Sequence, residues 1–314
     1  MGRVTSTVRW AYLGPEGTFT EQAACELAST LPEPPELVSA AGVSAALAAL
    51  RSGEVEAACV PLESSVEGAV PLTQDELIHG APLMIVAEAY VPVTFDLLVR
   101  AGTSLDDVRT VGAHPHGLAQ IRGWLADRLP AAQTVVHASN AAAAAAVAAG
   151  ELDAAAAAPV AADTYGLIAA ARDIGDVRDA VTRFVLLRRP GPPPAPTGND
   201  RTSMMLSVDN EPGALLAVLS EFATRGVNLT RLESRPTRNG LGDYVFLVDA
   251  EGHIADPALA DVAAALTRRG ALPRLLGSYA RRSGAAAPAA RYATDSAYAA
   301  AARTVAQWQN GAWS

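Results

Sequence analysis

Several turns in the first half of the chain place hydroxyl side chains and unpaired backbone N–H groups where helices are expected to begin. They are Gly17-Thr18, Ser64-Ser65 and the approach to Gly117. A helix N-terminus carries partial positive charge and free N–H donors, so turns of this kind that converge on one cleft would bind a carboxylate. A single turn of this type is better explained by ordinary helix capping. Their recurrence after successive strands favours a cleft for an anionic small molecule.

Carboxylates and imidazoles lie beside the same turns. Glu16 and Glu63 are candidates for acid/base catalysis, but local hydrogen bonding to turn N–H groups explains them equally well. His114 and His116 form a pair that could donate two metal ligands. Because no acidic residue lies near them in the sequence, a turn is the better interpretation, and we expect no metal site.

The order of apolar runs and turns predicts the elements that would position these groups. We expect strands followed by helices in repeated units: 8–13 with a helix capped by Thr20, 57–61 with a helix from Val70, 110–112 with a helix over 117–129, and 134–136 with an alanine-rich helix after Ser139-Asn140, then a strand over 154–159. This alternation is typical of a mainly parallel α/β sheet. Residues 91–99 and the segment after Tyr165-Gly166-Leu167 are expected to cross between two lobes, with the cleft between them.

A second domain is expected after a proline-rich stretch. Residues 190–198 are too rich in proline for a helix or a central strand and predict a stiff, extended spacer. Beyond it we expect strands over 203–209, 227–234, 244–250 and 274–279, with helices over 213–225 and 258–269. That βαββαβ order is the ferredoxin-like arrangement. From residue 281 onward small side chains predict a flexible tail, with a short helix over 297–308 as the alternative.

Composition narrows the classes of partner. The chain has 314 residues, half of them apolar, and a formal charge of −9, which argues against nucleic acid or an anionic membrane as a partner. All 24 basic residues are arginine, so neither a Schiff-base lysine nor a phosphate-loop lysine exists. Cys25 and Cys59 suggest no disulfide framework, which fits a cytoplasmic setting. The start, Met1–Ser6, does not read as a secretory signal, and the apolar tract over 141–149 is too short to span a bilayer.

Taken together, several segments resemble prephenate dehydratase. They are Tyr12-Leu-Gly-Pro-Glu-Gly-Thr-Phe-Thr20, Val60-Pro-Leu-Glu-Ser64, Ala113-His-Pro115 with Gln120, Tyr165-Gly-Leu167 and Thr182-Arg-Phe184. The C-terminal part resembles the ACT regulatory domain of that family through Gly213-Ala-Leu215 and Glu233-Ser-Arg-Pro236. The match runs through residues 8 to 280 in the family's order, which is far more specific than any single motif.

The resemblance implies an α/β fold with a two-lobed catalytic domain like a type II periplasmic binding protein, over 8–189. A linker over 190–201, a ferredoxin-like ACT domain over 202–280 and a tail over 281–314 would follow. The reaction would convert prephenate to phenylpyruvate with loss of carbon dioxide and water, without a cofactor. The protein would be a homodimer or homotetramer that phenylalanine inhibits through the ACT domain.

The resemblance also assigns roles to single residues. Thr182 would donate a hydrogen bond or a proton to the leaving hydroxyl, and Arg183 would bind a carboxylate or polarise its neighbour. The substrate-binding candidates are Thr18, Ser64, Ser65, Gln120 and Phe184, the last expected mainly to pack. The candidates for the phenylalanine site, expected at a subunit interface, are Asn210, Gly213, Ala214, Leu215, Asn228, Leu229, Glu233 and Ser234.

Three positions depart from the family pattern, and two other activities remain open. Ser64 stands where asparagine is usual, Ala113 where serine is frequent and Asp179 where asparagine is common. Ser64 can still donate one hydrogen bond but reaches less far, so a water could fill the gap.

The alternatives are the same chemistry on the aminated substrate arogenate, and a non-catalytic amino-acid sensor on the same fold, because fold alone does not separate enzyme from sensor.

Overall fold

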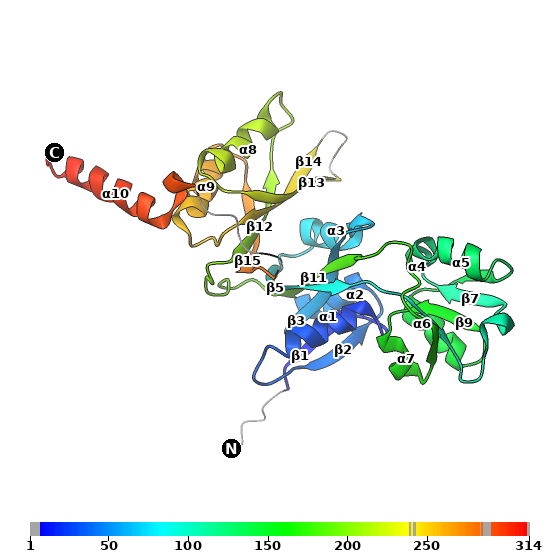
Figure 1. Cartoon of the computed structure of the whole chain (residues 1–314). Helices are drawn as coiled ribbons and strands as arrows, with labels where there is room; N and C mark the ends of the chain where they lie inside the picture. Colours follow the sequence, from blue (N-terminus) through cyan, green and yellow to red (C-terminus); the bar gives the residue numbers. More distant parts are fainter. Residues whose placement is uncertain (1–6, 239, 241–242, 283, 285–289, 313–314) are drawn as a thin grey trace, which may run out of the picture. The chain divides into compact units, whose positions relative to one another are not determined.

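The computed structural model describes residues 7–238, 240, 243–282, 284 and 290–312. The expectations for Met1–Ser6, and for the tail at 283, 285–289 and 313–314, lie outside the described residues. The chain forms two compact units, Met1–Glu76 with Ala89–Arg189 and Leu77–Glu88 with Pro190–Ser314. Figure 1 lets the reader follow each unit by colour and label.

The first lobe of the N-terminal unit is a mixed sheet with helices, built from alternating strands and helices as expected. Its strands run in the order β11, β3, β1, β2, with β1 parallel to both neighbours and β11 antiparallel to β3. The elements are β1 (Arg9–Leu13), α1 (Phe19–Ala28), β2 (Glu36–Ala40), α2 (Val43–Ser52), β3 (Ala57–Ser64), β4 (Gly68–Ala69), α3 (Pro71–His79) and β11 (Val181–Arg188). Both α3 and β5 (Met84–Pro92) pass from one unit to the other.

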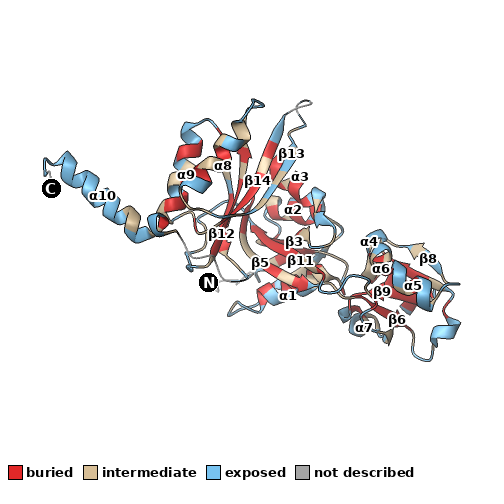
Figure 2. Cartoon of the chain, turned by 45° about the horizontal axis from the view of Figure 1, so that its top comes forward, coloured by how far each residue is buried: buried red, intermediate tan, exposed pale blue. Residues whose placement is uncertain are grey.

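The second lobe of this unit has a sheet of its own, in the order β10, β6, β9, β7, β8. Its elements are β6 (Asp96–Val99), η1 (Leu105–Asp107), β7 (Thr110–Ala113), α4 (Pro115–Gln120), α5 (Arg122–Arg128), β8 (Gln133–Val136), α6 (Asn140–Ala148), β9 (Ala154–Ala157), α7 (Val160–Tyr165) and β10 (Ile168–Ala171). The alanines of β9 are buried (Figure 2), and small side chains let α6 lie close to the sheet: a Cβ added at Gly112 would be 3.1 Å from Ala143 Cβ. The two crossings lie together, because the N–H of Val93 donates to the Ala180 carbonyl at 2.7 Å.

Two local expectations in this unit were wrong. Thr18, not Thr20, caps α1, and Thr20 lies inside the helix on its buried side. The helix expected over 117–129 is interrupted at Ile121, whose φ of −119° and ψ of 7° lie outside the helical range. Ile121 is buried, so the interruption turns α4 and α5 separately against the lobe's core.

The C-terminal unit contains the expected βαββαβ order. Its strands run in the order β13, β14, β12, β15, and its elements are β12 (Asp200–Ser207), α8 (Ala214–Thr224), β13 (Leu229–Pro236), β14 (Tyr244–Glu251), α9 (Pro257–Arg268) and β15 (Pro273–Ala280). Apolar residues of α8 and α9, including Phe222 and Val262, form one core with Met204 and Val248 of the sheet. The stretch over 191–197 has no regular structure, as its prolines predict.

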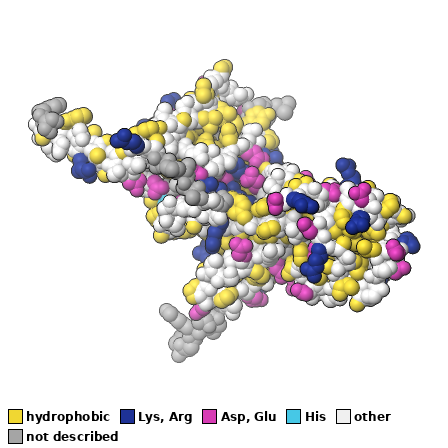
Figure 3. All heavy atoms as spheres, viewed as in Figure 1, with side chains coloured by type: hydrophobic (Ala, Val, Ile, Leu, Met, Phe, Trp, Pro, Cys, Tyr) yellow, Lys and Arg dark blue, Asp and Glu magenta, His cyan; other side chains and the backbone are white. Residues whose placement is uncertain are grey.

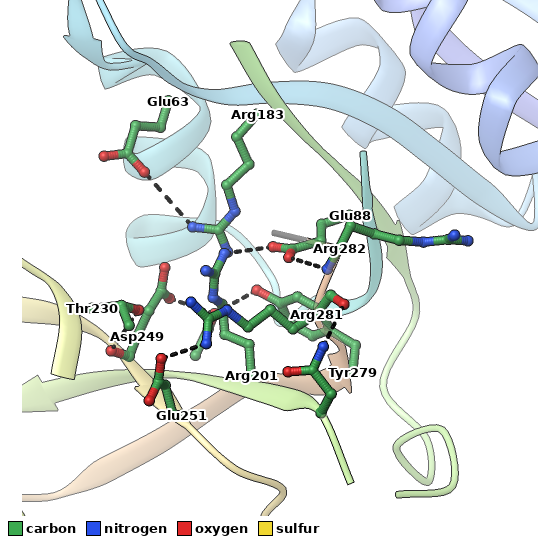
Figure 4. Close-up of polar contacts among 12 residues, drawn as sticks. Glu63, Glu88, Arg183, Arg201, Thr230, Asp249, Glu251, Tyr279, Arg281 and Arg282 are labelled. Carbon is green, nitrogen blue, oxygen red and sulfur yellow. Dashed lines mark hydrogen bonds and ion pairs between the residues drawn. The ribbon is translucent and has the colours of Figure 1, made fainter. Parts of the chain in front are cut away.

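A buried polar cluster ties the short segment Leu77–Glu88 into the C-terminal unit (Figure 4). Glu88 is fully buried, and its carboxylate accepts from the Arg201 guanidinium at 2.6 Å and from the backbone N–H of Arg282 at 2.9 Å. Arg274 donates to the Leu77 carbonyl in the same unit. A buried carboxylate with charged and backbone donors avoids the cost of an unpaired buried charge.

The described part of the tail contains a helix, as in the alternative given above for 297–308. Following η2 (Arg291–Ala293), α10 covers Asp295–Gln309, with the Thr294 hydroxyl accepting from the N–H of Ala297 as its cap. Alanine is the strongest helix former, and alanines fill much of this segment, which explains the helix. No described side chain of α10 is buried.

Candidate active site

A cavity of about 720 Å³ lies in the N-terminal unit. Its walls include the ends of β1 and β3, the start of β11 and the starts of α1, α4 and α6. Both lobes therefore line it. Most of its lining is apolar, with hydroxyl, amide and imidazole side chains among it. A concave, largely apolar site with a few polar groups is the usual form of a small-molecule pocket.

Thr182 lines the cavity near the start of β11. The antiparallel register places it opposite Ser64 at the end of β3, so the two hydroxyl-bearing residues are cross-strand neighbours. The Ser64 hydroxyl oxygen accepts from the N–H groups of Val66 at 3.2 Å and Glu67 at 3.3 Å, which leaves its proton available for donation. The sequence-predicted pair of Thr182 and Ser64 is therefore brought together at the cavity wall.

The neighbours of Thr182 take different positions. Phe184 is 2% exposed and lines the cavity as an apolar wall. Arg183 does not line it: its side chain is 4% exposed, and its guanidinium lies 3.7 Å from the Glu63 carboxylate (Figure 4). Successive side chains of a strand point to opposite faces, which explains the separation of Arg183 from Thr182. This arrangement fits the expected indirect role of Arg183 better than direct binding of a carboxylate.

Ser65 does not line the cavity either, contrary to its expected role as a substrate ligand. Its hydroxyl accepts from the N–H of Val181 at 2.9 Å, and its own N–H donates to the Val181 carbonyl at 2.9 Å. Ser65 thus holds the residue before Thr182 in place. Its contribution is to the position of the strand.

Helix starts line the cavity, as the turns predicted. Thr18 caps α1, where its hydroxyl accepts from Glu21 N–H at 3.3 Å and donates to the Leu13 carbonyl at 3.2 Å. That proton is already used, so Thr18 offers a ligand mainly its backbone. Ser139 caps α6 by accepting from Ala142 N–H at 2.9 Å. The positive ends of these two helices favour an anionic group in the cavity.

Gln120 lines the cavity from the end of α4, and two residues that sequence reasoning left out accompany it. Asn140 lies at the start of α6, where its side-chain oxygen accepts from the N–H of His114 at 2.8 Å. Ser39 lies near the end of β2 and also lines the cavity. Both residues come directly at the end of a strand or the start of a helix, which is the signal that could have identified them.

Few side chains of the lining are ionisable. Among the described residues that line the cavity, only Glu67, His114 and His116 can carry charge, and none is arginine. The Nδ1 atom of His116 lies 3.5 Å from Glu67 Oε2. Burial, and then the proximity of His116, lowers the pKa of His114, and His114 Nδ1 accepts from the backbone N–H of His116 at 3.3 Å.

The residues expected to bind phenylalanine are spread over the C-terminal unit. A hollow of about 140 Å³ lies at the start of α8, and Ala214 lines it together with Asp209 and Arg269. Gly213 precedes it with a φ of +84°, a conformation that favours glycine. The other candidates do not line this hollow: Asn210 and Leu215 flank it in sequence, and Asn228, Leu229, Glu233 and Ser234 lie before or along β13.

The surface and the helices carry two further findings. Figure 3 shows arginine and acidic side chains interspersed on the visible face rather than gathered in one basic patch. In the part of the chain that the structure describes, no helix combines the length and apolarity needed to cross a bilayer.

Comparisons with known proteins give consistent matches. A family model described as prephenate dehydratase matches residues 10–192, and one described as ACT domain matches residues 202–267. The chain is 51% identical over 287 residues to prephenate dehydratase of Amycolatopsis methanolica, covering 90% of this chain and 93% of that relative.

Solved structures agree with this over nearly the whole chain. The structure of prephenate dehydratase in complex with L-Phe from Arthrobacter aurescens has a TM-score of 0.88 and 42% identity, and the match covers 96% of this chain and 100% of that one. A structure described as GqqA, a novel type of quorum quenching acylase, has a TM-score of 0.77 and 32% identity, covering 87% and 98%.

Proposed function

We propose, since the chain belongs to the prephenate dehydratase family, that it converts prephenate to phenylpyruvate in the cavity of its N-terminal unit. The observation that most directly supports this function is the position of Thr182 on the cavity wall, opposite Ser64. Two helix N-termini line the same cavity and suit a substrate with two carboxylates.

The reaction requires few catalytic groups from the protein. The C–C bond to the ring carboxylate breaks, its electron pair completes the aromatic ring, and the C–O bond to the ring hydroxyl breaks, releasing carbon dioxide and water. Thr182 would donate a hydrogen bond or proton to the departing oxygen, where charge develops. A neutral threonine is a weak acid, so its surroundings must stabilise that transfer. Ser64 is the hydroxyl nearest to it along the strand pair.

Substrate binding is assigned to the lining residues. Ser64 and Gln120 would contact the substrate through side chains, Thr18 through its backbone, and Phe184 through its ring. Ser65 and Arg183 would act by holding β11, because neither lines the cavity. These roles are proposals that substitution can separate.

Regulation is assigned to the C-terminal unit. A prephenate dehydratase from Arthrobacter aurescens has been solved with L-Phe, and we extend this to the present chain as an allosteric inhibitor. The candidates at the start of α8 and along β13 would form the site together with a second subunit in a homodimer or homotetramer. Catalysis would lie in residues 8–189 and sensing in 202–280, joined by 190–201, in a cytoplasmic protein.

The direct test is turnover. Purified protein mixed with prephenate is expected to generate the absorbance of phenylpyruvate in alkaline solution, without any added cofactor. Arogenate, offered at the same concentrations, is expected to have a lower kcat/KM. Absence of product at high enzyme concentration would remove the assignment, and a preference for arogenate would replace it by the aminated substrate.

A further inference from the structure

The cavity presents an electrostatic problem for the proposed substrate. Prephenate carries two negative charges, yet in the described lining no arginine faces the cavity and the sequence has no lysine. Helix N-termini supply only partial charge. A full positive charge can come only from the imidazoles of His114 and His116 among these residues.

The two imidazoles differ in their ability to ionise. His114 is partly buried, its Nδ1 already accepts a backbone hydrogen bond, and burial followed by the proximity of His116 lowers its pKa. Both features favour the neutral ring. The rings are 5.1 Å apart between centroids, so two imidazolium ions would repel each other. His116 is therefore the member of the pair that can carry charge.

Glu67 lies on the other lobe and faces His116. The His116 side chain is 60% exposed, the Glu67 side chain is 38% exposed, and their nearest charged atoms are 3.5 Å apart. Glu67 precedes β4, whereas His116 lies in α4, so the pair joins the two lobes at the cavity. His116 therefore has an acidic neighbour from the other lobe at the cavity wall.

We propose that protonated His116 binds a carboxylate of the substrate and that Glu67 is the partner of His116 in the free protein. This inference rests on the proposed function for the identity of the dianion. The substrate carboxylate takes over the contact from Glu67, so the same imidazolium has a negative partner in the free and the bound states. His116 is thus a specificity-determining residue for a doubly charged substrate.

The ionisable groups that face His116 in the described cavity are Glu67 from the turn before β4 and His114 from its own helix. Loss of the proton from His116 removes the attraction for the dianion and leaves the repulsion from Glu67. KM for prephenate should therefore rise at higher pH, where His116 is neutral. The kcat should change less, because the contact forms on binding.

The first experiment measures KM and kcat for prephenate between pH 5.5 and 8.5. At the lowest pH of this series, His116→Gln should raise KM by roughly fivefold, since an exposed charged hydrogen bond is lost, and should flatten its pH dependence. Glu67→Gln should lower KM, because no carboxylate then competes with that of the substrate for His116. His79→Gln, an exposed histidine at the end of α3 outside the cavity, should leave both curves unchanged.

The second experiment does not need turnover. Calorimetric titration of prephenate into Thr182→Ala protein at pH 6 should give a Kd that His116→Gln in the same background raises by roughly fivefold and that His79→Gln leaves unchanged. An equal Kd with and without His116, or a KM curve that His116→Gln does not flatten, would overturn the inference. A parent protein that binds prephenate in this His116-dependent way but does not turn it over would instead contradict the proposed reaction alone.

Discussion

Successive side chains of β11 point to opposite faces of the strand, so neighbouring residues have different roles. Thr182 and Phe184 face the cavity, while Arg183 between them pairs with Glu63 away from it. A small shift of the strand would move the Thr182 hydroxyl relative to the substrate. The contacts of Ser65 with the backbone of Val181 restrain that shift, which makes the strand's position part of the site.

The hydroxyl of Thr182 is the group whose removal should be most costly to turnover. Thr182→Ala is expected to lower kcat by at least about a hundredfold, because general-acid help to the leaving hydroxyl is lost. Thr182→Ser keeps the hydroxyl and should retain much of the activity. Steady-state kinetics of both variants, with circular dichroism to verify folding, provide the measurement. A kcat of Thr182→Ala near that of the parent would exclude Thr182 from the chemistry.

Residue types at turns predicted part of the cavity lining, and the family resemblance predicted more of it. Thr18 and Ser64 lie at turns, whereas Gln120, Thr182 and Phe184 were assigned through the resemblance; all five line the cavity. The hydrogen bonds that occupy Ser65 were not predictable, because they depend on a strand more than a hundred residues away. His116 was interpreted as part of a turn, since its partner Glu67 lies near it only in space.

At the scale of elements, glycine decides where strands approach most closely. Gly277 of β15 pairs with Ile85 of β5, and its φ is +156°. A Cβ at this position would lie 2.2 Å from the Ile85 carbonyl oxygen, a backbone atom that cannot move without displacing its strand. The absence of a side chain is therefore a condition for this contact within the C-terminal unit.

Gly277→Ala should destabilise the protein by about 1–3 kcal/mol, because the added methyl overpacks a backbone contact. Gly191→Ala is the matched control, since a Cβ there meets nothing within 4 Å and its φ is not positive. Chemical denaturation followed by circular dichroism measures both. Equal stability of the two variants would show that the strands can separate at little cost.

Periodicity predicted most elements but not the ends that depend on tertiary structure. The strands and helices of the βαββαβ unit were correct within a few residues, because each alternates or repeats its apolar residues clearly. The interruption at Ile121 and the long strand β5 were missed. Ile121 is apolar and buried, and Asp176 bonds both sides of the break: its carboxylate accepts from the N–H groups of Gly123 and Trp124, and its own N–H donates to the Gln120 carbonyl. These contacts come from tertiary structure, so the helical pattern of the sequence could not predict the break.

The acid stability of the C-terminal unit should depend on Glu221. Hydrogen bonds from Arg269, opposed by burial and reinforced by Arg225, hold the pKa of Glu221 below its usual 4.5. A lowered pKa means that the charged form stabilises the folded state above pH 4.5, and that this stabilisation is lost as the pH falls through the lower folded-state value.

Glu221→Gln should therefore be less stable than the parent above pH 5, by about 1–3 kcal/mol for hydrogen bonds to a charged group. The two proteins should converge as the pH falls through the lowered pKa of Glu221 and the parent carboxylate becomes protonated. Urea denaturation at a series of pH values measures the difference. A difference that stays constant from pH 7 to pH 3 would show that ionisation of Glu221 does not contribute.

At the scale of the whole molecule, the chain divides at Pro190, where the proline-rich stretch begins, and also within α3 and β5, where the sequence gives no such signal. Leu77–Glu88 precedes much of the N-terminal unit in sequence but belongs to the C-terminal one. Removal of residues 200–314 would take away Arg201 and the N–H of Arg282, both of which bind the buried Glu88 carboxylate. An unpaired buried charge is strongly destabilising. Truncation would thus test folding together with regulation, and point substitutions test regulation more directly.

Phenylalanine is expected to lower the turnover of prephenate by the full chain. Ala214→Leu places a larger side chain in the hollow at the start of α8, which should exclude the effector and abolish the inhibition while kcat without phenylalanine stays near that of the parent. Ala299→Leu, at an exposed position on α10, is the matched control and should keep the parent's inhibition curve. The measurement is initial rate against phenylalanine concentration for the three proteins. Because none of the described residues of the unit that contains Ala214 lines the cavity, loss of inhibition with retained turnover would locate the effector in that unit. Inhibition that persists unchanged in Ala214→Leu would instead place the effector elsewhere.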